Sequence, residues 1–162
     1  MPEQQELDTG PHGAKLKDVV VRAIDEAIRR GASNVEAEHL LLAIAAGHEV
    51  TARTLAEFGL DHAGVEAALR GEREQALRAA GIDPVAEERL QSTRRSRPGW
   101  GASIREALRR APYRARSRSD GERLAIADTL IGILLADLGT VPRALAYAGV
   151  DRDALISRLE QL

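Results

Sequence analysis

The sequence predicts an all-α protein built from two tandem four-helix repeats that pack with pseudo-two-fold symmetry. Apolar residues recur at intervals of three and four along most of the chain, which is typical of amphipathic helices. The apolar pattern of residues 40–69 recurs at an offset of 89 or 90, which indicates a duplicated unit. No stretch alternates apolar and polar residues with a period of two, so no β-sheet is expected.

The composition limits both the interior and the kinds of site. Of the 162 residues 44% are apolar but only 2% are aromatic, so the core is expected to consist of Leu, Ala, Ile and Val. The absence of cysteine excludes disulfides and cysteine-based metal or redox sites. No apolar run approaches the roughly 18–20 residues of a membrane helix. Residues 1–13 lack the layout of a signal peptide, so a soluble cytoplasmic protein is expected.

The first repeat begins with an amphipathic helix and continues into an apolar one. Two arginines in the last turn of the first helix complement its dipole, and Gly31 can close it in the left-handed conformation. The second helix runs through Leu40–Ile44. It begins either with a capping box of Ser33 and Glu36 or nearer Glu36 itself. The apolar stripe of the first helix comprises Leu16, Val19, Val20, Ala23, Ile24, Ala27 and Ile28.

Two further helices complete the first repeat. The third covers about Thr51–Phe58 and ends at Gly59. Asp61 can then cap the fourth helix, because an aspartate oxygen accepts a hydrogen bond from a free N–H of the first turn. The fourth helix is expected to extend through Glu72–Ala80, and residues 83–90 could add a short helix.

The second repeat follows the same plan. Its first helix is expected at Ala102–Arg116, with Pro112 kinking or breaking it. Pro142 fits the first turn of a later helix. The remaining three helices are expected at 126–136, 141–148 and 152–161.

Charged residues are unevenly distributed along the sequence. Residues 92–118 carry nine arginines and one glutamate, whereas the segments on either side are net acidic. The predicted parts are a flexible N-terminus (1–13), a first repeat with a helical extension (14–91), a basic linker (92–101) and a second repeat (102–162).

The two copies match best at one helix-to-helix turn. Leu40–Ile44 aligns with Thr129–Ile133 at an offset of 89, and Leu55–Asp61 aligns with Leu145–Asp151 at an offset of 90. Both members of the second pair contain a Gly-apolar-Asp step, in which a glycine ends one helix and an aspartate caps the next.

The motif at Asn34–Leu42 carries a resemblance to a known family. It reads Asn-Val-Glu-Ala-Glu-His-Leu-Leu-Leu. It is close to the Asn-(Tyr/Asn)-Ile-Gly-Thr-Glu-His-Ile-Leu-Leu signature of the Clp amino-terminal repeat domain, as found in ClpC-type chaperones. Leu55–Leu60 is similar to that family's Leu-x-x-Leu-Gly-(Leu/Val) step, and Pro98–Ser103 lies where the family has Pro-Phe-Thr-Pro-Arg. The resemblance covers about residues 14–162 and implies a helical, substrate-receiving domain.

Departures from the family pattern limit what the resemblance implies. His12-Gly13 stands where the family has an aromatic-Thr pair, and Ile126–Asp128 replaces the second Thr-Glu-His. In ClpC-type domains that glutamate and threonine help to form a pocket for arginine-phosphorylated substrates. Only Glu38 of that set remains, so two symmetric phosphoarginine sites are not expected. No phosphate-loop motif occurs in these 162 residues, so the chain is not expected to be the motor. Its divergence from the family signatures favours a stand-alone protein without ATPase modules over a fragment of a longer ATPase.

Glu36, Glu38 and His39 form a small cluster of candidate ligands, and His48 follows nine residues on. A metal site needs three or four converging ligands, and no His-Glu-x-x-His spacing occurs. The interpretation is a capped helix start in which His39 bonds to neighbouring backbone, with Glu38 available to a partner. No cofactor, metal or catalytic residue is expected, and no nucleophile motif occurs, so the protein is not expected to be an enzyme.

Trp100 and Arg105 are the candidate peptide- or ligand-binding residues, together with Glu38. Trp100, the only tryptophan, can serve as a staple that packs the linker on the core. The resemblance instead implies that it belongs to a surface where peptides and small cyclic ligands dock, with Arg105 in place of a lysine of the family. An indole beside a cation suits such docking.

The arginine-rich segment 94–118 has three interpretations. It can be a basic linker and helix face docked on the protein's own acidic surface, with Glu106 paired to Arg110. It can bind an acidic or phosphorylated protein. It can also neutralise nucleic-acid phosphates, with Trp100 and Tyr113 stacking on bases. Its arginines are Arg94, Arg95, Arg97, Arg105, Arg109, Arg110, Arg114, Arg116 and Arg118.

The leading hypothesis is a non-enzymatic polypeptide-binding module that acts as an adaptor or decoy for Clp-dependent proteolysis. Its expected partners are polypeptide clients or Clp protease components, with peptide-like small ligands as a further class. The alternatives are a nucleic-acid-binding regulator using residues 94–118, which the net charge of −2 disfavours, and a purely structural oligomer. No membrane partner is expected.

Overall fold

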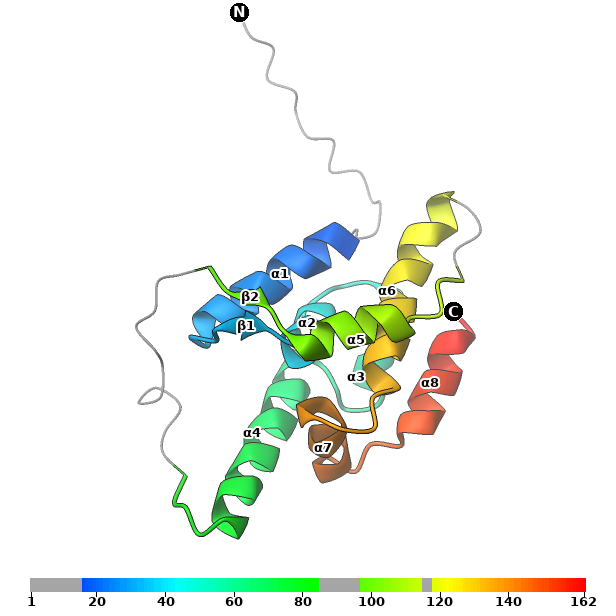
Figure 1. The fold of residues 1–162 in the computed structure, drawn as a ribbon. Helices are drawn as coiled ribbons and strands as arrows, with labels where there is room; N and C mark the ends of the chain where they lie inside the picture. The colour runs from blue at the N-terminus through cyan, green and yellow to red at the C-terminus, as the bar shows by residue number, and fades with distance from the viewer. Residues whose placement is uncertain (1–15, 85–96, 115–117) are drawn as a thin grey trace, which may run out of the picture.

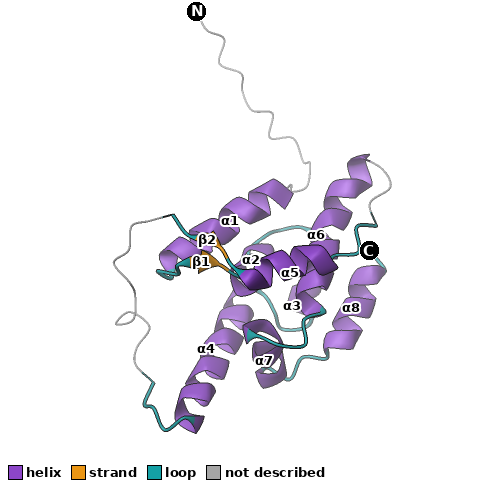
Figure 2. Cartoon of the chain, viewed as in Figure 1, coloured by secondary structure: helices purple, strands orange, loops and turns teal. Residues whose placement is uncertain are grey.

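The computed structural model describes residues 16–84, 97–114 and 118–162, with side chains from residue 125 onward in the last range. These residues form helices and one short pair of strands (Figures 1 and 2). The all-α prediction is confirmed. The elements are α1 (Leu16–Arg29), β1 (Asn34–Val35), α2 (Ala37–Ala45), α3 (Val50–Glu57), α4 (His62–Ala79), β2 (Gly99–Trp100), α5 (Ala102–Arg110), α6 (Arg118–Leu134), α7 (Thr140–Tyr147) and α8 (Arg152–Glu160).

Helix α2 is the centre of the molecule. Figure 1 shows it in the middle of the fold, and it packs against α1, α3, α4, α5, α6 and α7. Eight of its nine residues are buried, because its sequence is apolar on every face. Glu38 is the exception and is half-buried.

Helix α6 contains the second buried segment of the core, after α2. Its nine consecutive residues Ile126–Leu134 are all buried. Asp128 and Thr129 are the polar members of this run, and both are hydrogen-bonded: Thr129 Oγ1 donates to the Ala125 carbonyl at 2.7 Å. Residues of α2 and α6 together supply most of the large, fully buried side chains. The core is thus aliphatic, as the composition predicts.

The prediction of no sheet is wrong at one place. Strands β1 and β2 pair in parallel, with Asn34 opposite Gly99 and Val35 opposite Trp100. Gly99 N–H donates to the Ser33 carbonyl at 3.0 Å, and Gly101 N–H donates to the Val35 carbonyl at 2.9 Å. Strands of two residues are too short to show an alternating pattern, so periodicity could not reveal this ladder.

The ladder brings the start of α5 to the start of α2, and each helix caps the other. Ala37 N–H, in the first turn of α2, donates to Ser103 Oγ at 2.8 Å. Ser103 N–H, in the first turn of α5, donates to Glu36 Oε2 at 3.1 Å, and the Ser103 hydroxyl also bonds to that carboxylate. Helix N-terminal N–H groups have no partner within their own helix, so these bonds satisfy groups that would otherwise be unpaired.

The Gly-apolar-Asp step has the same local geometry at both places where it occurs. Gly59 and Gly149 end their helices with φ of 75° and 68°, in the region that favours glycine. Asp61 Oδ1 accepts from Gly64 N–H at 2.8 Å, and Asp151 Oδ1 accepts from Ala154 N–H at 3.0 Å. Helices α7 and α8 begin at an offset of 90 from α3 and α4. The pseudo-two-fold arrangement of whole repeats stays a prediction.

Several predicted helix bounds are confirmed and others are corrected. Pro142 lies in the first turn of α7, and Glu72–Ala80 extends α4 as far as Ala79. Helix α5 ends at Arg110, because Pro112 follows and cannot continue it. Helix α6 begins eight residues before the predicted 126, and Ser33 does not cap α2, whose N-cap is Glu36. The predicted N-terminus 1–13, most of helix 83–90 and residues 92–96 of the linker lie outside the described residues.

Gly132→Ala tests the close approach of α5 to α6. A Cβ at Gly132 would lie 2.1 Å from the Ala107 carbonyl oxygen, so the two helices would have to separate. We expect the free energy of unfolding, measured by urea denaturation, to fall by about 1–3 kcal/mol.

Gly71→Ala is the matched control, because Gly71 is also a mid-helix glycine. The nearest atoms to a Cβ there belong to the ring of Tyr147, which is half exposed and can move. Its free energy of unfolding should stay within about 1 kcal/mol of the wild type. Equal losses in the two variants would contradict the close-approach argument.

Candidate functional site

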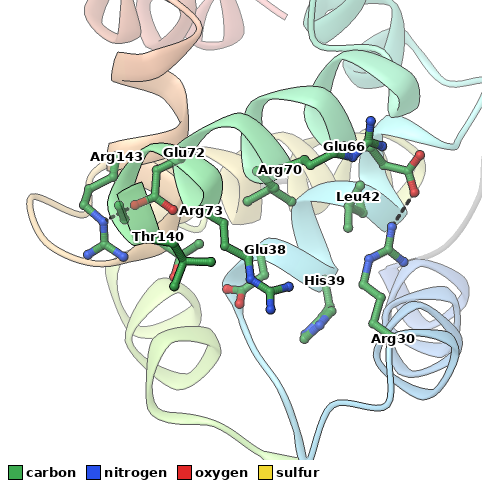
Figure 3. A pocket seen from close by; sticks show the side chains of 13 residues that line it. Arg30, Glu38, His39, Leu42, Glu66, Arg70, Glu72, Arg73, Thr140 and Arg143 are labelled. Atoms are coloured by element: carbon green, nitrogen blue, oxygen red, sulfur yellow. Dashed lines mark hydrogen bonds and ion pairs between the residues drawn. The ribbon is translucent and has the colours of Figure 1, made fainter. Parts of the chain in front are cut away.

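A cavity of about 500 Å³ lies beside α2, between α4 and the start of α7, with the end of α1 at its other side (Figure 3). Its size is within the range of sites for small molecules and peptide side chains. Its lining is both charged and apolar. The lining residues are Arg30, Glu38, His39, Leu42, Glu66, Leu69, Arg70, Glu72, Arg73, Ala76, Leu77, Thr140 and Arg143.

One end of this α4 cavity is fixed by an ion-pair cluster around buried Glu26. His62 Nε2 lies 2.9 Å from Glu26 Oε1, and Arg29 Nη2 lies 2.7 Å from the same oxygen. Arg30 bonds to Glu26 as well and reaches Glu66 on α4 at 2.5 Å. Burial alone would raise the pKa of Glu26, but the His62 hydrogen bond and the arginine charges outweigh burial and lower it. The cluster ties α1 to α4.

The other end is fixed by a pair between α4 and α7. Glu72 lies at a core-facing position of α4 and is buried. Arg143 Nε donates to Glu72 Oε1 at 2.7 Å. A buried carboxylate needs such a partner, because removing an unpaired charge from water costs several kcal/mol. Sequence reasoning did not single out Glu72 as a site residue. Its helical spacing from Val65, Ala68 and Leu69 places it on the apolar stripe of α4, and that spacing could have revealed its burial.

Glu38 lies between the two ends and is the one residue of α2 that reaches the surface. Burial raises its pKa, and the nearby Glu36 charge adds to the rise. A backbone hydrogen bond and the Arg143 charge oppose the rise without cancelling it. Glu38 therefore holds its proton more readily than an exposed glutamate does.

His39 also lines this cavity. Its Nδ1 accepts from the Glu36 backbone N–H at 2.9 Å, as expected from a capped helix start. Burial, helped by the Arg30 charge, lowers the pKa of His39 to about 4, so the ring is neutral at pH 7. Because a backbone N–H can only donate, the neutral ring carries its proton on Nε2.

A second cavity, of about 550 Å³, lies at the start of α2. It is formed by the starts of α2 and α5 and by the α6–α7 connection, and it contains Glu36, Ser103 and Glu106. Glu38 and Thr140 line both cavities. Ser103 was not singled out in the sequence, since nothing local links it to a helix 66 residues away.

Trp100 and Arg105 lie apart from both cavities. Trp100 is 45% exposed on β2, and Arg105 is exposed on the first turn of α5. Neither lines the two cavities, whereas Glu38 lines both. Of the three site residues predicted from the sequence, only Glu38 therefore lines a cavity. Trp100 and Arg105 lie on exposed surface outside both cavities.

Three arginines of the arginine-rich segment form hydrogen bonds or ion pairs within the protein. Arg114 donates through its backbone N–H and its Nε to Asp128, at 2.6 and 2.7 Å. Arg110 donates to the Gly132 carbonyl, and Glu106 pairs with Arg109 at 2.9 Å instead of with Arg110 as predicted. Spacings of three and four both fit a helix, so the sequence could not choose between the two arginines. The side chains of Arg94, Arg95, Arg116 and Arg118 lie outside the described residues.

Within the described ranges no three His, Cys, Asp or Glu side chains converge as metal ligands do. The same ranges contain no helix long and apolar enough to cross a membrane. The fold and its cavities thus define a mostly helical domain with two concave, mixed-polarity surfaces beside a buried central helix.

Comparison with known protein families identifies the family to which this domain belongs. The family model described as the Clp repeat (R) N-terminal domain matches residues 13–134. The match covers most of the chain, which therefore belongs to the Clp N-terminal repeat family. No curated protein shows a significant match to the chain.

His39→Gln tests the pH dependence of folding. The His39 pKa is below that of an unfolded histidine, so between pH 6.5 and 4 the unfolded chain binds more protons. The contribution of the neutral His39 ring to the free energy of unfolding is therefore complete above about pH 6.5. It is lost as the pH falls toward 4. We expect the variant to lose about 1–3 kcal/mol less stability than the wild type between pH 7 and pH 4.

The measurement is urea denaturation at several pH values. His48→Gln is the matched control, because His48 is exposed. Its stability curve should run parallel to that of the wild type. A His39→Gln curve that also runs parallel to the wild type would mean that His39 does not carry this pH dependence.

Proposed function

We propose that the chain is a non-enzymatic polypeptide-binding module that serves Clp-dependent proteolysis as an adaptor or a decoy. Membership of the Clp N-terminal repeat family carries the proposal, since domains of this family receive substrates and adaptors for Clp unfoldases. The proposed mechanism is occupancy, in which a client or a Clp component is held and no bond is broken. The proposed location is the cytoplasm, where such partners act.

The proposed docking surface comprises Trp100 and Arg105, with Glu38 as a separate contact. Trp100 is 45% exposed, so nearly half of its surface is available for binding, and Trp and Arg are residue types that often dominate protein interfaces. Trp100 is also held rigidly, because the β1–β2 ladder fixes its backbone against Val35. A rigid anchor loses little conformational entropy on binding.

A nucleic-acid role is a weaker proposal for the arginine-rich segment. Arg109, Arg110 and Arg114 already bind acceptors of the protein itself. Phosphate binding by these three side chains would first have to break those contacts.

The proposal predicts selective capture of Clp components. The purified chain is tethered, native lysate is passed over it at moderate salt, and the retained proteins are identified by mass spectrometry. Clp subunits should be retained, and Trp100→Ala with Arg105→Ala should lower their recovery about tenfold or more, since loss of interface anchors costs about 2 kcal/mol or more.

The control column carries Ile82→Ala with Arg78→Ala. This pair also removes one exposed apolar side chain and one exposed cation, but at the far end of α4. Recovery should stay at the wild-type level. Equal recovery on all columns would remove the Trp100–Arg105 surface from the proposal, and retention of nuclease-sensitive material alone would favour the nucleic-acid role.

A further inference from the structure

We infer that the exposed strand β2 binds an extended polypeptide segment by backbone pairing, so that the segment becomes a third strand beside β1 and β2. The inference rests on the proposed function, polypeptide binding, and adds the conformation and the charge of the bound segment. The segment is extended and carries acidic side chains. The site is the outer edge of β2, with the indole of Trp100 beside it.

The first argument is the direction of the backbone groups of β2. Gly99 N–H and Gly101 N–H, on either side of Trp100, both donate to carbonyls of the β1 side, at 3.0 and 2.9 Å. Successive residues of a strand direct their N–H and C=O groups to opposite sides, so Trp100 directs both of its groups away from β1. The backbone hydrogen bonds of the described residues include neither group of Trp100. The outer edge of β2 thus has a free donor and a free acceptor.

The second argument is that this edge is open to solvent. Within the described ranges the sheet has two strands, and β1 lies on one side of β2. Gly99 and Trp100 are both exposed, and no described helix packs against β2 as closely as β1 does. An unpaired strand edge is a template for pairing with another chain, and strand addition is a general mode of peptide recognition.

The third argument is that the edge is formed before a ligand arrives. The pairing with β1 holds Trp100 in an extended conformation, so binding does not have to order this strand. Neighbouring strands bring side chains of the same face within about 5 Å of one another. The exposed indole can therefore pack on a side chain of the added strand while the backbone groups pair.

The fourth argument is charge, which decides what occupies the edge. Arg97 precedes β2, Arg105 follows it in the first turn of α5, and both are exposed. Among the described residues neither side chain has an ion pair or a hydrogen bond, whereas Arg109 of the same helix pairs with Glu106. Two cations without partners attract carboxylates, and they would repel the same two arginines of a second copy of the chain. The favoured occupant is therefore an acidic segment of another protein.

The test is a titration followed by fluorescence anisotropy. The probe is a fluorescein-labelled peptide, Glu-Thr-Val-Thr-Val-Glu, with blocked ends, whose β-branched residues favour an extended conformation. An ester twin has oxygen in place of the central backbone N–H groups, and a neutral twin has Gln in place of Glu. The ester twin should bind about five- to tenfold more weakly, because it cannot donate to the Trp100 carbonyl. The neutral twin should bind about two- to fivefold more weakly, because exposed ion pairs contribute little each.

Two substitutions of Trp100 separate its backbone from its side chain. Trp100→Ala and Trp100→Pro both remove the indole, but only proline also removes the backbone N–H. Proline is compatible with an edge strand where the N–H faces outward. Trp100→Ala should weaken binding of the acidic peptide about three- to tenfold, and Trp100→Pro should weaken it at least about threefold further. Ile82→Ala removes an exposed apolar side chain beyond α4 and should bind as the wild type does. Thermal unfolding checks that each variant is folded.

The Trp100 amide gives a direct readout that does not depend on any variant. Because Trp100 is the only tryptophan, a chain labelled isotopically at tryptophan gives one backbone amide signal in its NMR spectrum. An exposed amide without a partner exchanges its hydrogen with water quickly. Pairing with an added strand should slow this exchange about tenfold or more at saturating peptide.

The outcomes separate this inference from the proposed function. Equal affinity for the acidic peptide and its ester twin, or unchanged exchange of the Trp100 amide at saturating peptide, would overturn the inference. Equal affinity for the neutral twin would overturn its acidic specificity, and dimerisation that Trp100→Pro abolishes would make a second copy the occupant. Capture of Clp subunits without strand pairing would overturn the inference and leave the proposed function standing. Strand pairing without capture of Clp subunits would do the reverse.

Discussion

Burial of α2 on nearly every side is the constraint on which the rest of the structure depends. A nine-residue helix with apolar side chains on every face cannot lie on a surface, so other helices must surround it. Helices α1, α3 and α4 do so from the first half of the chain, and α5, α6 and α7 from the second half. Both cavities lie along the edges of this packing, and Glu38, the residue of α2 that escapes burial, lines both of them.

Charged side chains in this fold connect helices as well as facing solvent. Glu26 joins α1 to α4 through His62, and Glu72 joins α4 to α7 through Arg143. Asp128 holds the chain that leads from α5 into α6 through Arg114. Each of these carboxylates is buried, and each is paired, as the cost of an unpaired buried charge requires.

The sequence predicts the helices well because their signals are local. Apolar spacing located α1, and the Gly-apolar-Asp steps located the turns before α4 and α8, since each depends on residues within one or two helical turns. The β1–β2 ladder and the Ser103 cap join residues about 65 positions apart, and no local pattern encodes such a pairing. The cavity could not be predicted for the same reason: Glu38 was visible as a candidate, but the arginines that line the cavity with it come from α4, α7 and the turn after α1.

The exchanged caps at Glu36 and Ser103 bear on where this chain can be divided. Residues 16–84 hold the start of α2 and residues 97–114 hold the start of α5, so neither segment alone carries both halves of this bond set. A fragment that ends before Ser103 would leave the Ala37 N–H without its protein partner, and one that begins after Glu36 would do the same to the Ser103 N–H. A cut between the two segments therefore separates groups that begin each other's helices.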